Sequence, residues 1–132
     1  MREIKFRGFN RKNGVWLYGF YLQNRGAHFV CPDEFADGKS WDDYEIDPKT
    51  RGEYTGLKDK NGQEIYEGDI VKRKGFCPDY EKKFKCVIEW SGAGWKARKP
   101  IGIHSATDWP LSTPGIIEII GNIHDNPELL KG

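Results

Sequence analysis

The sequence has 132 residues, with 21 lysine and arginine residues against 20 aspartate and glutamate residues, and a net charge of +1. This length fits one domain that buries a core without disulfides or metals, and the near-neutral charge by itself indicates no polyanionic partner. No apolar run approaches the roughly 20 residues of a membrane span, and the N-terminus lacks the apolar stretch of a signal peptide, so a cytoplasmic location is expected.

Three strands are expected near the N-terminus. Residues 3–10 alternate along the chain in the pattern of a strand. Asn13-Gly14 then predicts a tight turn, since both residues tolerate positive φ. Residues 15–22 (VWLYGFYL) carry bulky side chains on both faces, so this strand is expected to be covered on both sides or to lie at a subunit contact. A third strand is predicted at residues 27–30.

Residues 33–54 are the least regular part of the chain. Turn and capping signals recur there, such as Asp47-Pro48. Trp41, Tyr44 and Ile46 lie among these signals and are expected to pin the segment to the core. A connection of this length is uncommon without a function. Two interpretations remain open, namely a functional lid and an arm that packs on a neighbouring subunit.

The stretch from Thr55 to Lys72 (TGLKDKNGQEIYEGDIVK) has a readable local role at each position. Asn61-Gly62 predicts a hairpin turn, residues 63–66 a short strand, and residues 67–69 a second turn. The next strand is expected at residues 69–74. We expect this stretch to join the two halves of the chain and to fix the register between their strands.

The C-terminal half alternates strands with loops. Residues 84–90 and 95–98 are expected to form a hairpin, with Trp90 on the core-facing side of its first strand. Residues 116–123 are almost continuously apolar, so this strand is expected to be buried on both faces. Asn126 predicts the N-cap of a short C-terminal helix, with Pro127 at the first helical position.

Together these elements predict a mostly β protein. It would have about eight short antiparallel strands in a twisted sheet or an SH3-like small barrel, with a short C-terminal helix. Residues 1–132 are expected to form a single compact domain. Within it, residues 1–54 would form an N-terminal hairpin plus an irregular loop, and residues 55–132 a barrel-like part.

Charge is unevenly distributed along the near-neutral chain. Residues 1–32 carry a net +5, residues 33–71 a net −7, residues 72–99 a net +6 and residues 100–132 a net −3. One interpretation pairs opposite charges between neighbouring strands. The other is a bipolar surface that supports head-to-tail self-association or binds a polyanion on one face.

Three blocks of the sequence carry a resemblance to a known family. The first is the opening MREIKFR, followed by WLYG at residues 16–19. The second is YTGLKDKNG at residues 54–62, continued by EIYEGDIV at residues 64–71. The third is IGNI at residues 120–123, followed by NPELL at residues 126–130. The chain resembles the YopX family in these blocks, which occur in the family's order and bracket nearly the whole length.

This resemblance implies a small, mostly β protein encoded by a bacteriophage or an integrated prophage and working inside the bacterial host. It implies no catalytic residues, because the family has no assigned activity to carry over. We therefore expect a protein that is not an enzyme.

The sequence also fits calcium binding and hydrolysis poorly. A calcium loop needs Gly at its sixth position and Glu at its twelfth, whereas a loop starting at Asp59 has Gly62 at the fourth and Glu67 at the ninth. The acidic clusters at residues 42–47 and 64–69 lack a nucleophile–base pair or a phosphate-binding glycine motif beside them. Neither a calcium site nor a hydrolase or nuclease site is therefore expected.

A zinc site is equally poorly supported, and no metal or other cofactor is expected. His28 and Cys31 have a typical ligand spacing, but no second pair does. Cys31, Cys77 and Cys86 are widely spaced and odd in number, so they are expected to be free thiols in a reducing compartment.

The basic segment at residues 72–99 supports a nucleic-acid-binding alternative. Its cations are interleaved with aromatic residues, and on a small β domain cations contact phosphates while exposed aromatics stack on bases. The competing interpretation is that the lysines are solvated on strand edges, where they discourage aggregation. The candidate contacts are Lys72, Arg73, Lys74, Lys82, Lys83, Lys85, Lys96, Arg98 and Lys99.

The preferred interpretation is a self-assembling or protein-binding module. The N-terminal hairpin carries more aromatic side chains than so small a domain easily buries, and exposed aromatic patches mark interfaces. The candidate interface residues are Trp16, Tyr18, Phe20 and Tyr21. The expected partner is a second copy of the chain or another phage or host protein, with no membrane association.

Overall fold

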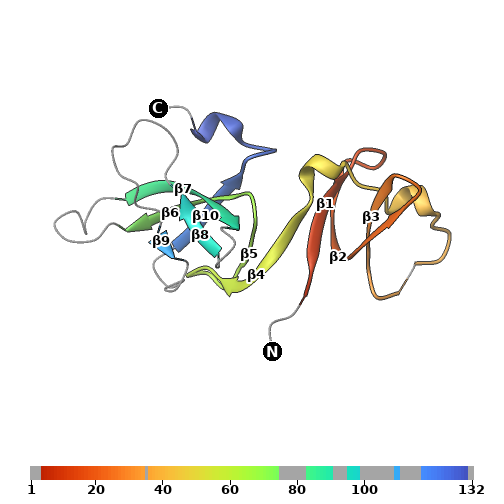
Figure 1. Ribbon diagram of the computed structural model, residues 1–132, viewed down its shortest axis with the longest axis horizontal. Coiled ribbons are helices and arrows are strands. Elements are labelled where there is room, and N and C mark those ends of the chain that lie inside the picture. Colours follow the sequence, from red (N-terminus) through yellow and green to blue (C-terminus); the bar gives the residue numbers. More distant parts are fainter. Residues whose placement is uncertain are drawn as a thin grey trace. The chain divides into compact units, whose positions relative to one another are not determined.

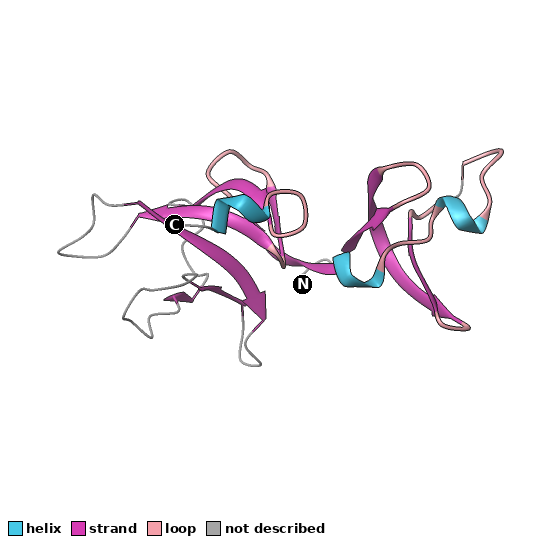
Figure 2. Cartoon of the chain, turned by 90° about the horizontal axis from the view of Figure 1, so that it is seen from above, coloured by secondary structure: helices cyan, strands magenta, loops and turns pink. Residues whose placement is uncertain are grey.

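The computed structural model of the protein describes residues 4–34, 36–74, 83–90, 95–98, 109–110 and 117–130. Antiparallel strands dominate these residues, and the helices among them are three short 3-10 turns (Figure 1, Figure 2). The prediction of a mostly β protein is therefore confirmed. The chain divides into two compact units, residues 1–54 and 55–132, and each has its own apolar core.

Three consecutive strands form an antiparallel meander in the first unit. They are β1 (Phe6–Asn10), β2 (Val15–Asn24) and β3 (Ala27–Cys31), paired in the order β3-β2-β1. The turns between them have positive φ at Gly14 and at Arg25-Gly26, so the predicted turn at Asn13-Gly14 is confirmed and a second turn joins β2 to β3. β2 extends two residues further than its sequence pattern indicates.

The irregular segment contains two 3-10 turns, η1 (Trp41–Asp43) and η2 (Pro48–Thr50), and ends in β4 (Gly52–Lys58). Tyr44 and Ile46 are buried as expected and join the unit's core. Sequence analysis missed β4, whose alternation is short and interrupted by Gly56. β4 begins in the first unit and continues into the second.

Residues 44–54 form backbone hydrogen bonds with the strands of their own unit. On the β3 side, Val30 N donates to Tyr44 O at 3.0 Å and Ile46 N donates to His28 O at 2.8 Å. On the β1 side, Asp47 N donates to the carbonyl of β1's Phe9 at 2.9 Å, and β4 then pairs with β1. The segment therefore covers both outer edges of the meander. The sequence had suggested a functional lid or an arm that packs on a neighbouring subunit.

The second unit contains a five-stranded antiparallel sheet in the order β10-β6-β7-β8-β9. The elements of this unit after β4 are β5 (Glu64–Tyr66), β6 (Asp69–Lys74), β7 (Lys83–Trp90), β8 (Trp95–Arg98), β9 (Trp109–Pro110), β10 (Ile117–Asn122) and η4 (Pro127–Leu130). β5 pairs with β4 and ends the sheet that includes the meander. Neither sheet closes on itself within the described residues, so the SH3-like barrel is not confirmed.

The core of the second unit is aliphatic. It consists of the buried residues Ile65, Val71, Cys86, Ile88 and Ile117, with Leu57, Trp95 and Ile119 packed against them. Each fully buried aliphatic side chain contributes about 1.5–3 kcal/mol of transfer free energy.

Two predictions for this core are wrong. Trp90 is the last residue of β7 and is 50% exposed, with its ring in an edge-on contact with Trp95 at 5.1 Å between ring centroids. In β10 only Ile117 is fully buried, and the residues after it are partly exposed. This strand lies at the end of its sheet.

No helix among the described residues has the length and apolar character needed to cross a membrane.

The pairing of β2 with β3 requires glycine at position 19, since a Cβ atom there would lie 1.9 Å from the carbonyl oxygen of Cys31. We predict that Gly19→Ala destabilises the protein by about 1–3 kcal/mol, the usual cost of overpacking. Urea unfolding of the variant would measure the loss. Gly14→Asn is the control, because nothing lies within 4 Å of a Cβ atom at Gly14 and asparagine tolerates its positive φ. A stability of Gly19→Ala equal to that of the control would contradict the prediction.

Candidate functional site

Buried polar side chains hold the turns of the stretch from Thr55 to Lys72. Thr55 is buried at the start of the stretch. Its Oγ1 donates to Ile65 O at 2.8 Å and accepts from Leu57 N at 3.2 Å. One hydroxyl therefore connects the paired strands β4 and β5, and the threonine has a structural role.

The turn between β5 and β6 is closed by Asp69. Its buried carboxylate accepts from Tyr66 N at 2.8 Å. Gly68, in the same turn, has a φ of 90°. The backbone of Gly68 donates to Ile88 O and accepts from Ile123 N, each at 2.9 Å. The turn is therefore bonded both to β7 and to the segment that follows β10.

Asp59 makes the most extended connection of the stretch. Its side chain is buried, with the residue 6% exposed. Oδ1 accepts from Asn61 N at 2.9 Å and from Gln63 N at 3.0 Å, both in the turn between β4 and β5. Oδ2 accepts from Ile119 N of β10 at 3.0 Å. One carboxylate therefore clips the hairpin to a strand 60 residues further along the chain.

The protonation of Asp59 follows from these contacts. Burial by itself raises the pKa of Asp59, but the hydrogen bonds from Ile119, Gln63 and Asn61 outweigh it and bring the pKa below its usual value. The charged form is thus the form that the fold stabilises. Asp59 is the first residue of the calcium-like spacing, and its carboxylate binds three backbone amides of the fold.

We predict that Asp59→Asn destabilises the protein by about 1–3 kcal/mol at neutral pH, because the amide NH₂ group cannot accept and leaves a buried N–H unpaired. The folded pKa of Asp59 lies below its unfolded value of about 3.9. Its stabilisation is therefore complete above that value and is lost as the pH falls through the folded pKa. Urea unfolding between pH 7 and pH 3 should show the two proteins converging in acid. A gap that does not change with pH would contradict the assignment.

The acidic cluster at residues 42–47 ties the irregular segment to the turn after β1. Asp43 accepts from Ser40 N at 3.0 Å and Asn13 Nδ2 at 3.1 Å, and pairs with Lys12 at 2.9 Å. These contacts, with Ser40 the largest, lower the pKa of Asp43. Asp47 caps η2 by accepting from Lys49 N at 3.1 Å and pairs with Arg11 Nη2 at 2.6 Å.

A cleft of about 380 Å³ lies beside these ion pairs. It is lined by Asn10, Arg11, Lys12, Asp42, Glu45, Ile46, Asp47 and Pro48. Asn10 is buried and donates to the carbonyls of Asp42 and Glu45 at 3.1 and 2.7 Å. The polar groups at this cleft therefore hold the segment against the sheet.

The four predicted interface aromatics divide between two environments. Tyr18 and Phe20 are 50% and 47% exposed. Trp16 and Tyr21 are partly buried, and Trp16 packs edge-on against Phe9 with ring centroids 5.5 Å apart. Of these four residues, only Tyr18 and Phe20 are therefore about half exposed to a partner.

Tyr21 belongs to a polar and aromatic cluster within the first unit. Its ring contacts Phe6 at 5.7 Å, and the guanidinium of Arg51 lies 4.7 Å from its centroid. Its hydroxyl hydrogen-bonds Nδ1 of His28. Cys31 is fully buried and burial raises the pKa of its thiol, which disfavours the thiolate that metals bind. The contacts of His28 and the burial of Cys31 therefore give both residues a structural role.

Among the described residues, no three histidine, cysteine, aspartate or glutamate side chains gather closely enough to hold a metal ion. Cys31 and Cys86 are buried thiols that are not in disulfides, and Cys77 lies outside the described residues.

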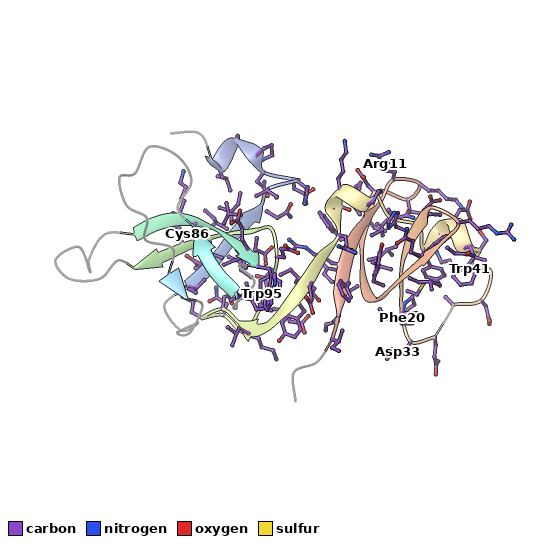
Figure 3. All side chains as sticks on the ribbon, viewed as in Figure 1. Arg11, Phe20, Asp33, Trp41, Cys86 and Trp95 are labelled. Carbon is purple, nitrogen blue, oxygen red and sulfur yellow. The ribbon has the colours of Figure 1, made fainter. Side chains whose placement is uncertain are left out.

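The first unit also carries an apolar groove of about 270 Å³ lined by Leu22, Asn24, Phe29 and Trp41. Trp41, which was expected to pin the irregular segment to the core, is 53% exposed (labelled in Figure 3). Its ring packs edge-on against the core residue Phe29, with ring centroids 5.4 Å apart. Phe20 precedes Leu22 by two residues on β2 and therefore faces the same side. The sequence placed Trp41 among turn signals, and nothing local distinguishes a ring that caps Phe29 from one that is buried.

The structure describes part of the basic segment. Lys72 is exposed and Lys85 is partly exposed. For Arg73, Lys74, Lys83, Lys96 and Arg98 it describes the strand backbone only, and Lys82 and Lys99 lie outside the described residues.

The register of β6 with β7 places lysines opposite one another. Lys72 lies opposite Lys85, and Lys74 lies opposite Lys83. We call these four residues the lysine ladder. On the other side of β6, Lys72 lies opposite Glu118, whose carboxylate pairs with Lys60 at 3.7 Å. Neither Lys72 nor Lys85 forms an ion pair with a described residue.

Like charges directly opposite each other on a sheet are destabilising. We predict that Lys85→Glu, which places a carboxylate opposite Lys72, stabilises the protein by about 0.2–1 kcal/mol. Thermal unfolding at low salt would measure the gain, which should shrink as salt screens the pair. Lys39→Glu, on an exposed loop of the first unit, changes the net charge equally and is the control. No gain over this control would contradict the ladder's geometry.

The comparisons with known proteins agree with this fold. A family model described as YopX protein matches residues 5–131. The crystal structure of protein EF1440 from Enterococcus faecalis is similar to this chain with a TM-score of 0.61 and 24% identity, over 99% of this chain and 100% of that one. That likeness shows a shared fold, and no curated protein matches. Because the family model spans nearly the whole sequence, the chain belongs to the YopX family.

Proposed function

We propose that this chain is a protein-binding module without enzymatic activity, which assembles with itself or binds another protein. We further propose that it is encoded by a phage or prophage and acts in the cytoplasm of the bacterial host. The observation that carries the proposal is the apolar groove, with the half-exposed rings of Phe20 and Trp41 on its face of the first unit.

The physical chemistry of this surface favours an interface. When a partner covers a large aromatic ring that is half exposed, the ring's apolar surface is removed from water. This burial favours binding by about 25 cal/mol per Å² of apolar area. Tryptophan in particular is enriched among the few residues that dominate binding energies. Leu22 and Phe29 give the groove an apolar lining, to which Asn24 adds a polar group.

The mode of contact follows from the edges of the meander. Residues 44–54 already occupy the outer backbone groups of β3 and β1. A partner at these edges therefore cannot bind by adding a strand. Side-chain docking into the groove is the mode that the first unit leaves open.

The lack of enzymatic activity is proposed from the roles of the acidic side chains. Asp43 and Asp47 hold η1 and η2, whereas Asp59 and Asp69 hold turns of the second unit. These contacts give each carboxylate a structural role. They support a protein that works through its surface.

We predict that the wild-type chain self-associates with rising concentration and that Trp41→Ala and Phe20→Ala each weaken this association at least tenfold, because each removes aromatic area from the groove face. Sedimentation velocity over a concentration series would measure it. Trp90→Ala is the matched control, since Trp90 is as exposed as Trp41 but belongs to the second unit. A chain that stays monomeric throughout, or equal losses in the Trp41 and Trp90 variants, would contradict the proposal.

A further inference from the structure

We propose that the lysine ladder of the second unit binds the phosphate backbone of a nucleic acid. This activity goes beyond the protein-binding role of the first unit and uses different residues. It rests on the register of β6 and β7, which places Lys72 opposite Lys85 and Lys74 opposite Lys83, although the members of each pair are well separated in sequence.

The ladder has a regular spacing. Lys72 and Lys74 are two residues apart on β6, and Lys83 and Lys85 are two residues apart on β7. Successive rungs are therefore about 6.6 Å apart along the strands, and the two strands are about 4.8 Å apart. A repeating row of charges suits a repeating polyanion better than a single carboxylate. Phosphate contacts of this kind need no particular base sequence.

The acidic groups that the structure describes near the ladder do not neutralise it. Glu118 lies opposite Lys72 on β10, but its carboxylate pairs with Lys60, so two lysines share one acid. Glu89 lies four residues beyond Lys85 on β7 and faces Lys96 on β8. Among the described residues around the ladder, lysines therefore outnumber acids, although the whole chain carries only +1.

The ladder is also electrostatically unfavourable in the free protein. Opposed lysines repel each other, and a bound phosphate would relieve that repulsion by lying between them. Binding of a polyanion releases its condensed counterions, which makes the affinity strongly dependent on salt. The proposal thus predicts a specific signature in a binding experiment.

The test is fluorescence anisotropy with labelled single-stranded and duplex DNA over a salt series. The double variant Lys72→Gln/Lys85→Gln should bind at least tenfold more weakly than the wild type. Its slope of log affinity against log salt should fall by about 0.7 per lysine for single strands and about 0.9 for duplex. Lys39→Gln/Lys49→Gln is the control, because both lysines are exposed on the first unit and the charge change is the same.

Three results would overturn the proposal: no binding by the wild type at low salt, equal losses in the ladder and control variants, or equally tight binding of polyglutamate. Thermal unfolding would establish that the ladder variant is folded, which is expected because the substitution removes a repulsion. Trp41→Ala should retain wild-type DNA binding. This last arm separates the ladder from the groove, so that either proposal can fail alone.

Discussion

The second unit depends on one buried carboxylate. A charge removed from water is tolerated only where hydrogen bonds replace its hydration, and Asp59 has three of them, from Asn61, Gln63 and Ile119. Lys60 N adds a backbone hydrogen bond to Ile117 O at 3.0 Å beside them. These contacts attach β10 to the hairpin of β4 and β5, whereas its other edge pairs with β6. The register of β6 with β7 sets which lysines face each other on the sheet.

In the first unit, a segment of chain rather than a single carboxylate connects the strands. Residues 44–54 bond to β3 on one side and to β1 on the other, and the ion pair of Asp43 with Lys12 holds η1 in place. η1 in turn brings Trp41 against Phe29, and the apolar groove exists because of that contact. The irregular segment is therefore the element that builds the candidate binding surface.

Sequence reasoning succeeded where the signal is local. Asn13-Gly14 marks its turn because the backbone there needs positive φ, and alternation located strands in both sheets, although it missed β4. It failed where the cause is distant. The partner of Asp59 is 60 residues away, and the exposure of Trp90 depends on where β7 ends relative to its neighbours. The opposed pair of Lys72 and Lys85 follows from register, which no single strand specifies. The sequence therefore identified candidate residues, but the pairing of strands decided which of them share a surface.

The central claim is that the stretch from Thr55 to Lys72 is an architectural clip that couples the hairpin to β10. Native-state amide hydrogen exchange, followed by NMR, tests this coupling most directly. If Asp59 holds both elements, the amides of Asn61, Gln63 and Ile119 open together and report one common free energy of opening. Rapid exchange at Ile119 beside strong protection at Asn61 and Gln63 would contradict the account, because β10 would then open independently of the hairpin.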